Sequence, residues 1–378
     1  MEIALIFRIG VSILGSFGAF AAGMIARPIG AMFFGHIGDK ISRKHALFGS
    51  LILMSLPTFL IGFLPTYAQI GILAPILLVV LRLIQGFSVG GEYASSIVYL
   101  VEEAPKGYQN LYGSFVSLGA KLGMAIGSAF YTYLLMHYGE SSMLDWVWRV
   151  PFLASIVLAV IGILLRNGLE NHYKVEQSDK IPLVEIFKSH RFELWHFFII
   201  ASAIWMFYYT LFIYLPTWLS DYSHIQKATA STLNTYSIAL GVIFIPVMAY
   251  IADRFGSFKV MQITAIAITV LIVPIFLMLQ NEDIVIQIVA VTLMTILLCA
   301  FQAPIFASAV NALPERRYRA SFTAIILGSA AGIVGGTTPA LMASVAKLSS
   351  VAIAPAFFIL FATILSLRSV HYLMKYKS

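Results

Sequence analysis

A short polar stretch inside a long apolar run is the first place in this chain where chemistry is expected. Residues 81–94 read LRLIQGFSVGGEYA and place Arg82 and Glu92 within an apolar run from Gly71 to Leu100. In a helix the two charges would lie about 15 Å apart along the axis and about 80° apart around it. They cannot pair directly, but both can face one cavity. Ionisable groups at such depth normally face a bundle interior or a wet pathway.

Other apolar runs also contain cations. Arg27 lies about 12 Å from one end of its run, where it can meet an anionic group. Lys121 lies midway along a run and needs a partner or a wet cavity, and Glu92 is the candidate partner. Glu92 is also the candidate proton carrier, with an ion-pair anchor as the alternative. For Arg82 one interpretation is structural, in which it satisfies backbone carbonyls or holds helices together.

Aromatic side chains recur at near-helical spacing in the apolar run that follows residue 191. They are Trp205, Tyr208, Tyr209 and Phe212. Such a stripe can form a wall for a quaternary ammonium group, because a cation is attracted to the face of an aromatic ring. Helix packing or an interfacial belt is the alternative.

A charged loop follows the first apolar run and has a counterpart later in the chain. It reads GHIGDKISRK at residues 35–44, and AYIADRFGSF at residues 249–258 repeats it with Asp253 over Asp39. A carboxylate at a helix end can cap a neighbouring helix, and such a contact can form in one conformation and break in another. We therefore predict a gate, with a solvated topology anchor as the alternative for Lys44. Its residues are Gly35, Asp39, Lys40, Arg43, Lys44, Asp253 and Arg254.

The elements that must position these residues are membrane helices. The chain has 378 residues, of which 60% are hydrophobic and 11% charged, and its mean hydropathy is +0.90. Apolar runs of about 20 residues, long enough to cross the hydrocarbon core as helices, recur along the whole length. We predict an all-α membrane protein with about eleven spans, at residues 12–35, 46–65, 72–100, 111–136, 146–165, 192–219, 228–252, 258–280, 284–312, 321–346 and 351–372.

One polar interval divides the chain. Residues 166–191 separate five predicted spans from six, so we expect an N-terminal bundle at 1–165, a central loop, and a C-terminal bundle at 192–378. Seventeen lysines and arginines lie in one alternating set of connectors, and two, Lys227 and Lys347, lie in the other. By the positive-inside rule the first set, which includes the central loop and the C-terminus, is cytoplasmic.

The two halves resemble each other in sequence. Pro105 falls over Pro314 at an offset of 209 residues, and glycines that suit close helix packing follow the same offset. Two full spans precede Asp253 but only one precedes Asp39, so the symmetry predicts that a first helix is absent from this sequence. The glycines are Gly119, Gly123 and Gly127 in the first half and Gly328, Gly332 and Gly336 in the second.

These features resemble the major facilitator superfamily, whose members have two six-helix bundles and a Gly-x-x-x-Asp-(Lys/Arg) loop after the second helix. Ser42 stands where the family usually has glycine. Several stretches are similar to its metabolite:proton symporter branch, which includes osmolyte, dicarboxylate and shikimate carriers. They are ARPIGAMFFGHIGD (26–39), RLIQGFSVGGEY (82–93), LPERRYRASFTA (313–324) and GGTTPAL (335–341). The RxxQGxxxGGE string, which contains Gln85, is the most specific of them.

The resemblance implies a secondary transporter of the inner membrane that couples a small organic solute to protons by alternating access. A carboxylate or a zwitterionic osmolyte such as proline or betaine is the expected solute. The family's equivalent of Arg82 is associated with coupling, and Gln85 is grouped with it. The alternative is a truncated carrier that does not transport, or a membrane sensor that binds the solute. The lipid bilayer is the other expected partner, and we expect a monomer.

Several other classes are not supported by the sequence. It contains no GxxxxGK[ST] loop, so the driving force must be a gradient rather than ATP. Cys299 is the one cysteine, and no His/Cys/Asp cluster has metal-ligand spacing, so we expect no metal or other cofactor. The net charge of +7 is spread over short connectors, so we expect no nucleic-acid partner. No catalytic domain is evident, so the protein is not expected to be an enzyme.

Overall fold

All regular secondary structure in the described part of the chain is helical. The computed structural model describes residues 13–168, 182–223, 225–349 and 351–377. The first half contains α2 (Ile13–Lys40), α3 (Arg43–Ile61), α4 (Tyr67–Ile70), α5 (Leu73–Glu103), α6 (Gln109–Asp145), the 3₁₀ turn η1 (Val147–Arg149) and α7 (Val150–Asn167). After α8 (Pro182–Ser189) come α9 (Arg191–Tyr209), the π-helical η2 (Thr210–Tyr214), α10 (Leu215–Tyr222), α11 (Lys227–Phe255), α12 (Ser257–Leu279), α13 (Ile284–Gln302) and α14 (Ile305–Val310). The last elements are the 3₁₀ turn η3 (Arg316–Tyr318), α15 (Arg319–Ser329), the π-helical η4 (Ala330–Gly335), α16 (Gly336–Ser349) and α17 (Ala354–Lys377).

The predicted membrane spans correspond to long helices. Nine helical segments of the described residues are long and apolar enough to cross a membrane. Two further long helices, α2 with 28 residues and α6 with 37, lie at the predicted spans 12–35 and 111–136. Residue 12 lies outside the described residues. Gly139 interrupts α6 with a φ of 75°, a value that glycine adopts at no steric cost.

Three predicted spans are less regular than the sequence pattern indicates. The span at 284–312 is broken between α13 and α14, where Pro304 supplies no backbone N–H for a continuous helix. The spans at 192–219 and 321–346 each contain a π-helical segment, η2 and η4 respectively. The predicted central loop also contains a helix, α8, which begins at Pro182 and buries Ile186 completely.

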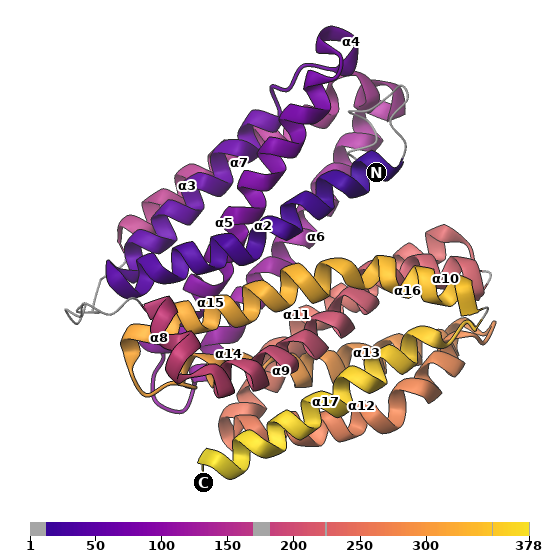
Figure 1. Ribbon diagram of the computed structural model, residues 1–378. Coiled ribbons are helices and arrows are strands. Elements are labelled where there is room, and N and C mark those ends of the chain that lie inside the picture. The colour runs from indigo at the N-terminus through magenta and orange to yellow at the C-terminus, as the bar shows by residue number, and fades with distance from the viewer. Residues whose placement is uncertain (1–12, 169–181, 224, 350, 378) are drawn as a thin grey trace.

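Two helical bundles converge at one end of the molecule and diverge at the other (Figure 1). Helices α2 to α7 form the N-terminal bundle, and α9 to α17 form the C-terminal bundle. Helix α8 lies where the bundles converge, in contact with α2 and α15. We call this end, which also carries the α2–α3 and α5–α6 turns, the α8 face. The opposite face carries α4 and α10 (Figure 1).

Glycines bring α2 and α5 into backbone contact. A Cβ at Gly86 would lie 1.8 Å from the carbonyl oxygen of Gly23, and a Cβ at Gly90 would lie 2.1 Å from that of Arg27. No side chain fits in either place, so the approach of the two helices depends on glycine. The stretch LRLIQGFSVGGEYA therefore fixes where α2, and with it Arg27, lies against α5.

The aligned glycines of the two halves do not behave alike. In the second half, Cβ atoms at Gly328 and Gly332 would lie 2.4 and 2.8 Å from atoms of α2, so these glycines pack closely against the N-terminal bundle. In the first half, no atom of another described helix lies within 4 Å of such a Cβ. The close packing that we predicted for Gly119, Gly123 and Gly127 is therefore not formed among the described residues.

Candidate functional site

A cavity of about 330 Å³ lies between the two bundles. The N-terminal bundle contributes Arg27 of α2, Val89, Gly90, Tyr93 and Ala94 of α5, and Ser117, Ala120 and Met124 of α6. The C-terminal bundle contributes Trp205, Tyr208, Tyr209, Ile213, Gln302, Leu327, Gly328 and Ala331. Because both bundles line this cavity, its shape must change whenever they move against each other.

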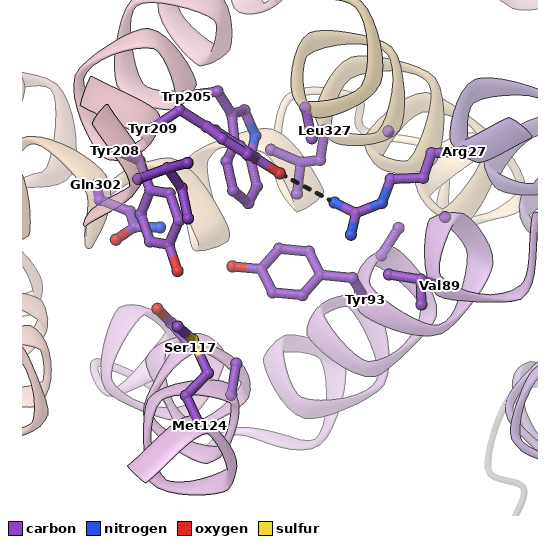
Figure 2. Close-up of a pocket in the computed structure, with 16 residues that line it drawn as sticks. Arg27, Val89, Tyr93, Ser117, Met124, Trp205, Tyr208, Tyr209, Gln302 and Leu327 are labelled. Atoms are coloured by element: carbon purple, nitrogen blue, oxygen red, sulfur yellow. Dashed lines mark hydrogen bonds between the residues drawn. The ribbon is translucent and has the colours of Figure 1, made fainter. Parts of the chain in front are cut away.

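Arg27 is the one charged residue among the described residues that line the cavity. Its guanidinium donates a hydrogen bond of 3.4 Å to the Tyr209 hydroxyl, across the interface between the bundles. Figure 2 shows this hydrogen bond at the edge of the cavity, with the Tyr93 ring pointing into the space below it. The Nε of Arg27 has no hydrogen-bond partner among the described residues. Arg27 therefore retains the capacity to bind an anionic group.

Aromatic rings form the wall that faces Arg27. The centre of the Trp205 ring lies 5.2 Å from that of Tyr208, 6.0 Å from that of Tyr209 and 5.9 Å from that of Tyr93. Three of these residues were predicted from the helical spacing, and the structure brings them to one side of the cavity (Figure 2). Electron-rich ring faces in this arrangement can hold a positively charged group.

Both π-helical segments lie beside the cavity. Ile213 of η2 and Ala331 of η4 belong to its lining, and η2 follows directly after Tyr209. A Cβ at Gly335, the last residue of η4, would lie 2.7 Å from the Tyr209 ring. Single π-helical turns inside α-helices are rare and occur often at functional sites. Here each segment contributes a residue to the cavity lining, and the end of η4 packs against the Tyr209 ring.

Arg82 and Gln85 do not line the cavity. The Arg82 guanidinium donates a hydrogen bond of 3.2 Å to Gln85, and the Gln85 amide donates one of 2.7 Å to the Thr58 hydroxyl of α3. These contacts join α5 to α3 inside the N-terminal bundle. In this conformation the two residues lie in a connection between helices and do not touch the cavity.

Glu92 pairs with Arg166 of α7, so its predicted pairing with Lys121 is wrong. Glu92 also accepts a hydrogen bond from the Ser50 hydroxyl, and Arg166 donates another to the backbone carbonyl of Leu47. Glu92 therefore connects α5 to α3 and α7, away from the cavity. The predicted pair of Glu92 and Lys121 does not form because spacing along a helix does not determine which neighbouring helix a side chain contacts.

Lys121 points into the C-terminal bundle. Its side chain is 2% exposed, and its ammonium nitrogen lies 4.2 Å from the centre of the Phe212 ring and 5.1 Å from that of Tyr208. No carboxylate of the described residues forms an ion pair with it. Lys121 is not part of the cavity lining, but its neighbour Ala120 and its contact Tyr208 are.

Asp39 caps a helix of the other bundle. Its carboxylate accepts hydrogen bonds of 3.0 Å from the Ala320 amide and 2.7 Å from the Ser321 amide, at the start of α15. Arg43 donates a third, of 2.5 Å, and also binds Glu102 of α5 at 3.1 Å. Close approach is possible because Gly35 faces the Ser321 backbone, where a Cβ would lie only 2.9 Å away.

The second half repeats this contact in the opposite direction. The Asp253 carboxylate accepts hydrogen bonds of 2.8 Å from the Asn110 amide and 2.9 Å from the Leu111 amide, at the start of α6. Arg254, which is exposed, donates to the Tyr108 and Tyr250 hydroxyls. Among the gate lysines, Lys40 is exposed and the Lys44 ammonium donates a hydrogen bond of 2.9 Å to the Asn167 carbonyl.

Several cavity residues were not singled out from the sequence. Tyr93 directly follows Glu92 in the sequence and lines the cavity. Ser117 and Gln302 are uncharged and lie in apolar runs, so no charge in the sequence marks them as candidates. Tyr93 lies about one turn from Gly90, but only the structure shows that this part of α5 lines the cavity. Leu327 and Met124 carry no chemical signal that separates them from core residues.

The fold and the cavity define a multi-pass membrane transporter built from two helical bundles. The chain belongs to the Major Facilitator Superfamily, which it matches over residues 2–339. The predicted all-α fold and family are thereby confirmed. The proteins that it resembles are transporters and not enzymes.

Curated relatives cover most of this chain. The proline/betaine transporter of Escherichia coli (strain K12) is 31% identical over 373 residues, which are 94% of this chain and 74% of the relative. The glycine betaine/proline/ectoine/pipecolic acid transporter of Dickeya dadantii (strain 3937) is 31% identical over 374 residues, which are 95% of this chain and 74% of the relative.

Solved structures share the fold at low sequence identity. The proton:xylose symporter XylE aligns with a TM-score of 0.74 and 13% identity, over 97% of this chain and 87% of the other. The transporter FucP in its outward conformation aligns with a TM-score of 0.74 and 15% identity, over 96% of this chain and 91% of the other.

Proposed function

We propose that the protein is a proton-coupled symporter of a small zwitterionic or carboxylate-bearing solute of the proline and betaine type. The observation that carries this proposal is the cavity in which Arg27 faces an aromatic wall. A solute carboxylate would bind the Arg27 guanidinium, and its cationic nitrogen would lie against Trp205 and the neighbouring tyrosines. The names of the two curated relatives, which transport such solutes, support the same class.

Alternating access is the mechanism that the bundle contacts favour. On the α8 face, Asp39 and Asp253 each cap a helix of the opposite bundle, and Arg43 donates a hydrogen bond of 2.9 Å to the Arg316 carbonyl. The bundles diverge toward the opposite face (Figure 1). Rocking of the bundles around the cavity would break these contacts and open the α8 face. Asp39, Arg43 and Asp253 would then act as the gate on this side.

The orientation in the membrane follows from the distribution of cations. The α8 face carries the connectors with most of the lysines and arginines, so we assign it to the cytoplasm of an inner membrane. The interval 166–191 and the C-terminus are then cytoplasmic, and 1–165 and 192–378 are the two bundles that move. In this orientation the conformation described here is closed to the cytoplasm.

Transport in proteoliposomes tests the proposal. Radiolabelled proline or glycine betaine should accumulate in vesicles under an imposed inward proton gradient, and a protonophore should abolish the accumulation. Arg27→Gln should lose uptake, because the cavity then has no charge to bind the solute carboxylate. Arg191→Gln is the matched control, since Arg191 is exposed and outside the cavity. Equal uptake with and without the gradient would exclude proton symport.

A further inference from the structure

Lys121 carries a buried amine that the proposed binding of the solute does not use. It lies on α6 of the N-terminal bundle, and its aromatic contacts, Phe212 and Tyr208, lie in η2 and α9 of the C-terminal bundle. Gly241 of α11 makes room for it, because a Cβ there would lie 3.2 Å from its Cδ and Cε. Lys121 is therefore a contact between the bundles, inserted into a space that the C-terminal bundle leaves for it.

Among the described residues, no carboxylate pairs with Lys121 to balance a positive charge on its amine. The ionisable groups that face it are the Tyr208 hydroxyl of α9 and the Cys299 thiol of α13, and α11 faces it with Gly241. Arg27 lies on the other side of the cavity and carries the same charge sign. A buried ammonium without a carboxylate is costly, and aromatic faces compensate only part of that cost. Its charged form is therefore sensitive to any negative charge that enters nearby.

The cavity is where such a negative charge would enter. Tyr208 both lines the cavity and faces the Lys121 ammonium, and Ser117, Ala120 and Met124 of α6 line the cavity beside Lys121. No acidic side chain contributes to the described lining. The carboxylate of a bound solute would thus be the negative charge nearest to both Arg27 and Lys121.

We infer that Lys121 takes up the coupling proton when the solute binds. This inference rests on the proposed proton-coupled transport. The lone pair of the neutral Lys121 amine takes a proton from a hydronium ion of the cavity water, so that one N–H bond forms, one O–H bond breaks and a water molecule is left. The proton leaves to cytoplasmic water after the solute does. Because linkage is reciprocal, a solute that favours protonation of Lys121 binds more tightly once Lys121 is protonated.

Glu92, the other candidate, is less suited to this role. It is held by Arg166, Ser50 and the helices of its own bundle, and it does not line the cavity. Lys121, by contrast, touches both the cavity wall and the opposite bundle. Its protonation can therefore respond to the solute and to the bundle movement together.

Proton uptake on solute binding tests the assignment. The purified full chain is titrated with glycine betaine and with proline in two buffers of different ionisation enthalpy, and the difference in heat gives the protons bound per solute. The wild type should take up close to one proton per solute, and its affinity should fall by about tenfold per pH unit where Lys121 is neutral before binding. Lys121→Met should take up none, and its affinity should not depend on pH.

Two further variants make the result decisive. Lys121→Arg carries a guanidinium that is not deprotonated in proteins, so this variant should bind solute without proton uptake. It provides the test even if Lys121→Met does not fold. Lys347→Met is the matched control, because Lys347 is exposed in α16, and it should behave as the wild type. Proton uptake that persists in Lys121→Arg, or is lost in Glu92→Gln alone, would overturn the assignment. Solute binding without proton uptake in the wild type would instead overturn the proposed proton coupling itself.

Discussion

Asp39 and Asp253 perform the same structural task in opposite directions. Asp39, at the end of α2, binds the first amides of α15, and Asp253, near the end of α11, binds the first amides of α6. Each carboxylate therefore ties its own bundle to the positive N-terminal end of a helix in the other bundle. Asp39 is the more deeply buried of the two and is also paired with Arg43, at side-chain exposures of 0% and 2%. The two contacts are alike in geometry, and that of Asp39 is reinforced by a buried ion pair.

Asp39→Asn should open the α8 face more than Asp253→Asn. Removing one partner of a buried ion pair costs about 3–5 kcal/mol. Asp253→Asn keeps one acceptor oxygen and loses one of two backbone hydrogen bonds, which costs about 1 kcal/mol. The readout is labelling of an Ala324→Cys thiol, in a Cys299→Ser background, by an impermeant reagent added at the α8 face. Ala324 is buried against Gly35, so its thiol reacts only when the bundles separate.

The matched control for this experiment is Asp283→Asn. Asp283 caps α13 through the Val285 amide, but both residues lie within the C-terminal bundle. The substitution should leave labelling at Ala324→Cys unchanged. Equal labelling in Asp39→Asn and Asp283→Asn would show that the Asp39 contact does not hold the face closed.

Arg27→Gln should weaken solute binding strongly. A hydrogen bond between charged groups contributes about 1.5–3 kcal/mol, so affinity should fall by roughly 10- to 150-fold. The measurement is a binding isotherm for glycine betaine on the purified protein at one pH. Arg191→Gln should bind as the wild type does. Unchanged affinity in Arg27→Gln would place the solute carboxylate elsewhere.

Glu92 and Arg166 should prove energetically coupled. Their side chains are 22% and 16% exposed, so the pair is screened less than a surface pair. We expect Glu92→Gln and Arg166→Gln to lower the free energy of unfolding non-additively, with a coupling of about 1–2 kcal/mol. Chemical unfolding of both single variants and the double variant in detergent measures it. Additive effects would mean that the observed pairing contributes nothing to stability.

Glycine positions in α5 and α6 should differ in how well they tolerate substitution by alanine. Gly90→Ala places a methyl group against the Arg27 carbonyl and should destabilise the protein by about 1–3 kcal/mol or more, because the backbones must separate. Gly123→Ala meets no described residue within 4 Å and should gain slightly in helix propensity. Melting temperatures of the two variants compare these effects directly. A larger loss in Gly123→Ala than in Gly90→Ala would contradict the packing.

The helices and the chemistry available to them could be predicted from the sequence. Length and polarity of each apolar run are properties of one segment, and they determine whether that segment spans a membrane. The repeat of Asp39 at Asp253 can likewise be recognised from the sequence, since the two halves share the pattern of an aspartate followed by a basic residue. Arg27 and the aromatic stripe from Trp205 to Tyr209 were identified for the same reason, because each lies on one helix.

Which side chains pair between different helices is determined only by the tertiary structure. Glu92 meets Arg166 rather than Lys121, and Arg82 lies away from the cavity, because the rotation and height of each helix in its bundle select its neighbours. Those rotations result from packing over many residues, such as the contact of Gly86 and Gly90 with α2. The period of a single helix carries no information about them. The sequence alone thus determined which charged groups enter the membrane, and the packing of the bundles determined which of them reach the cavity.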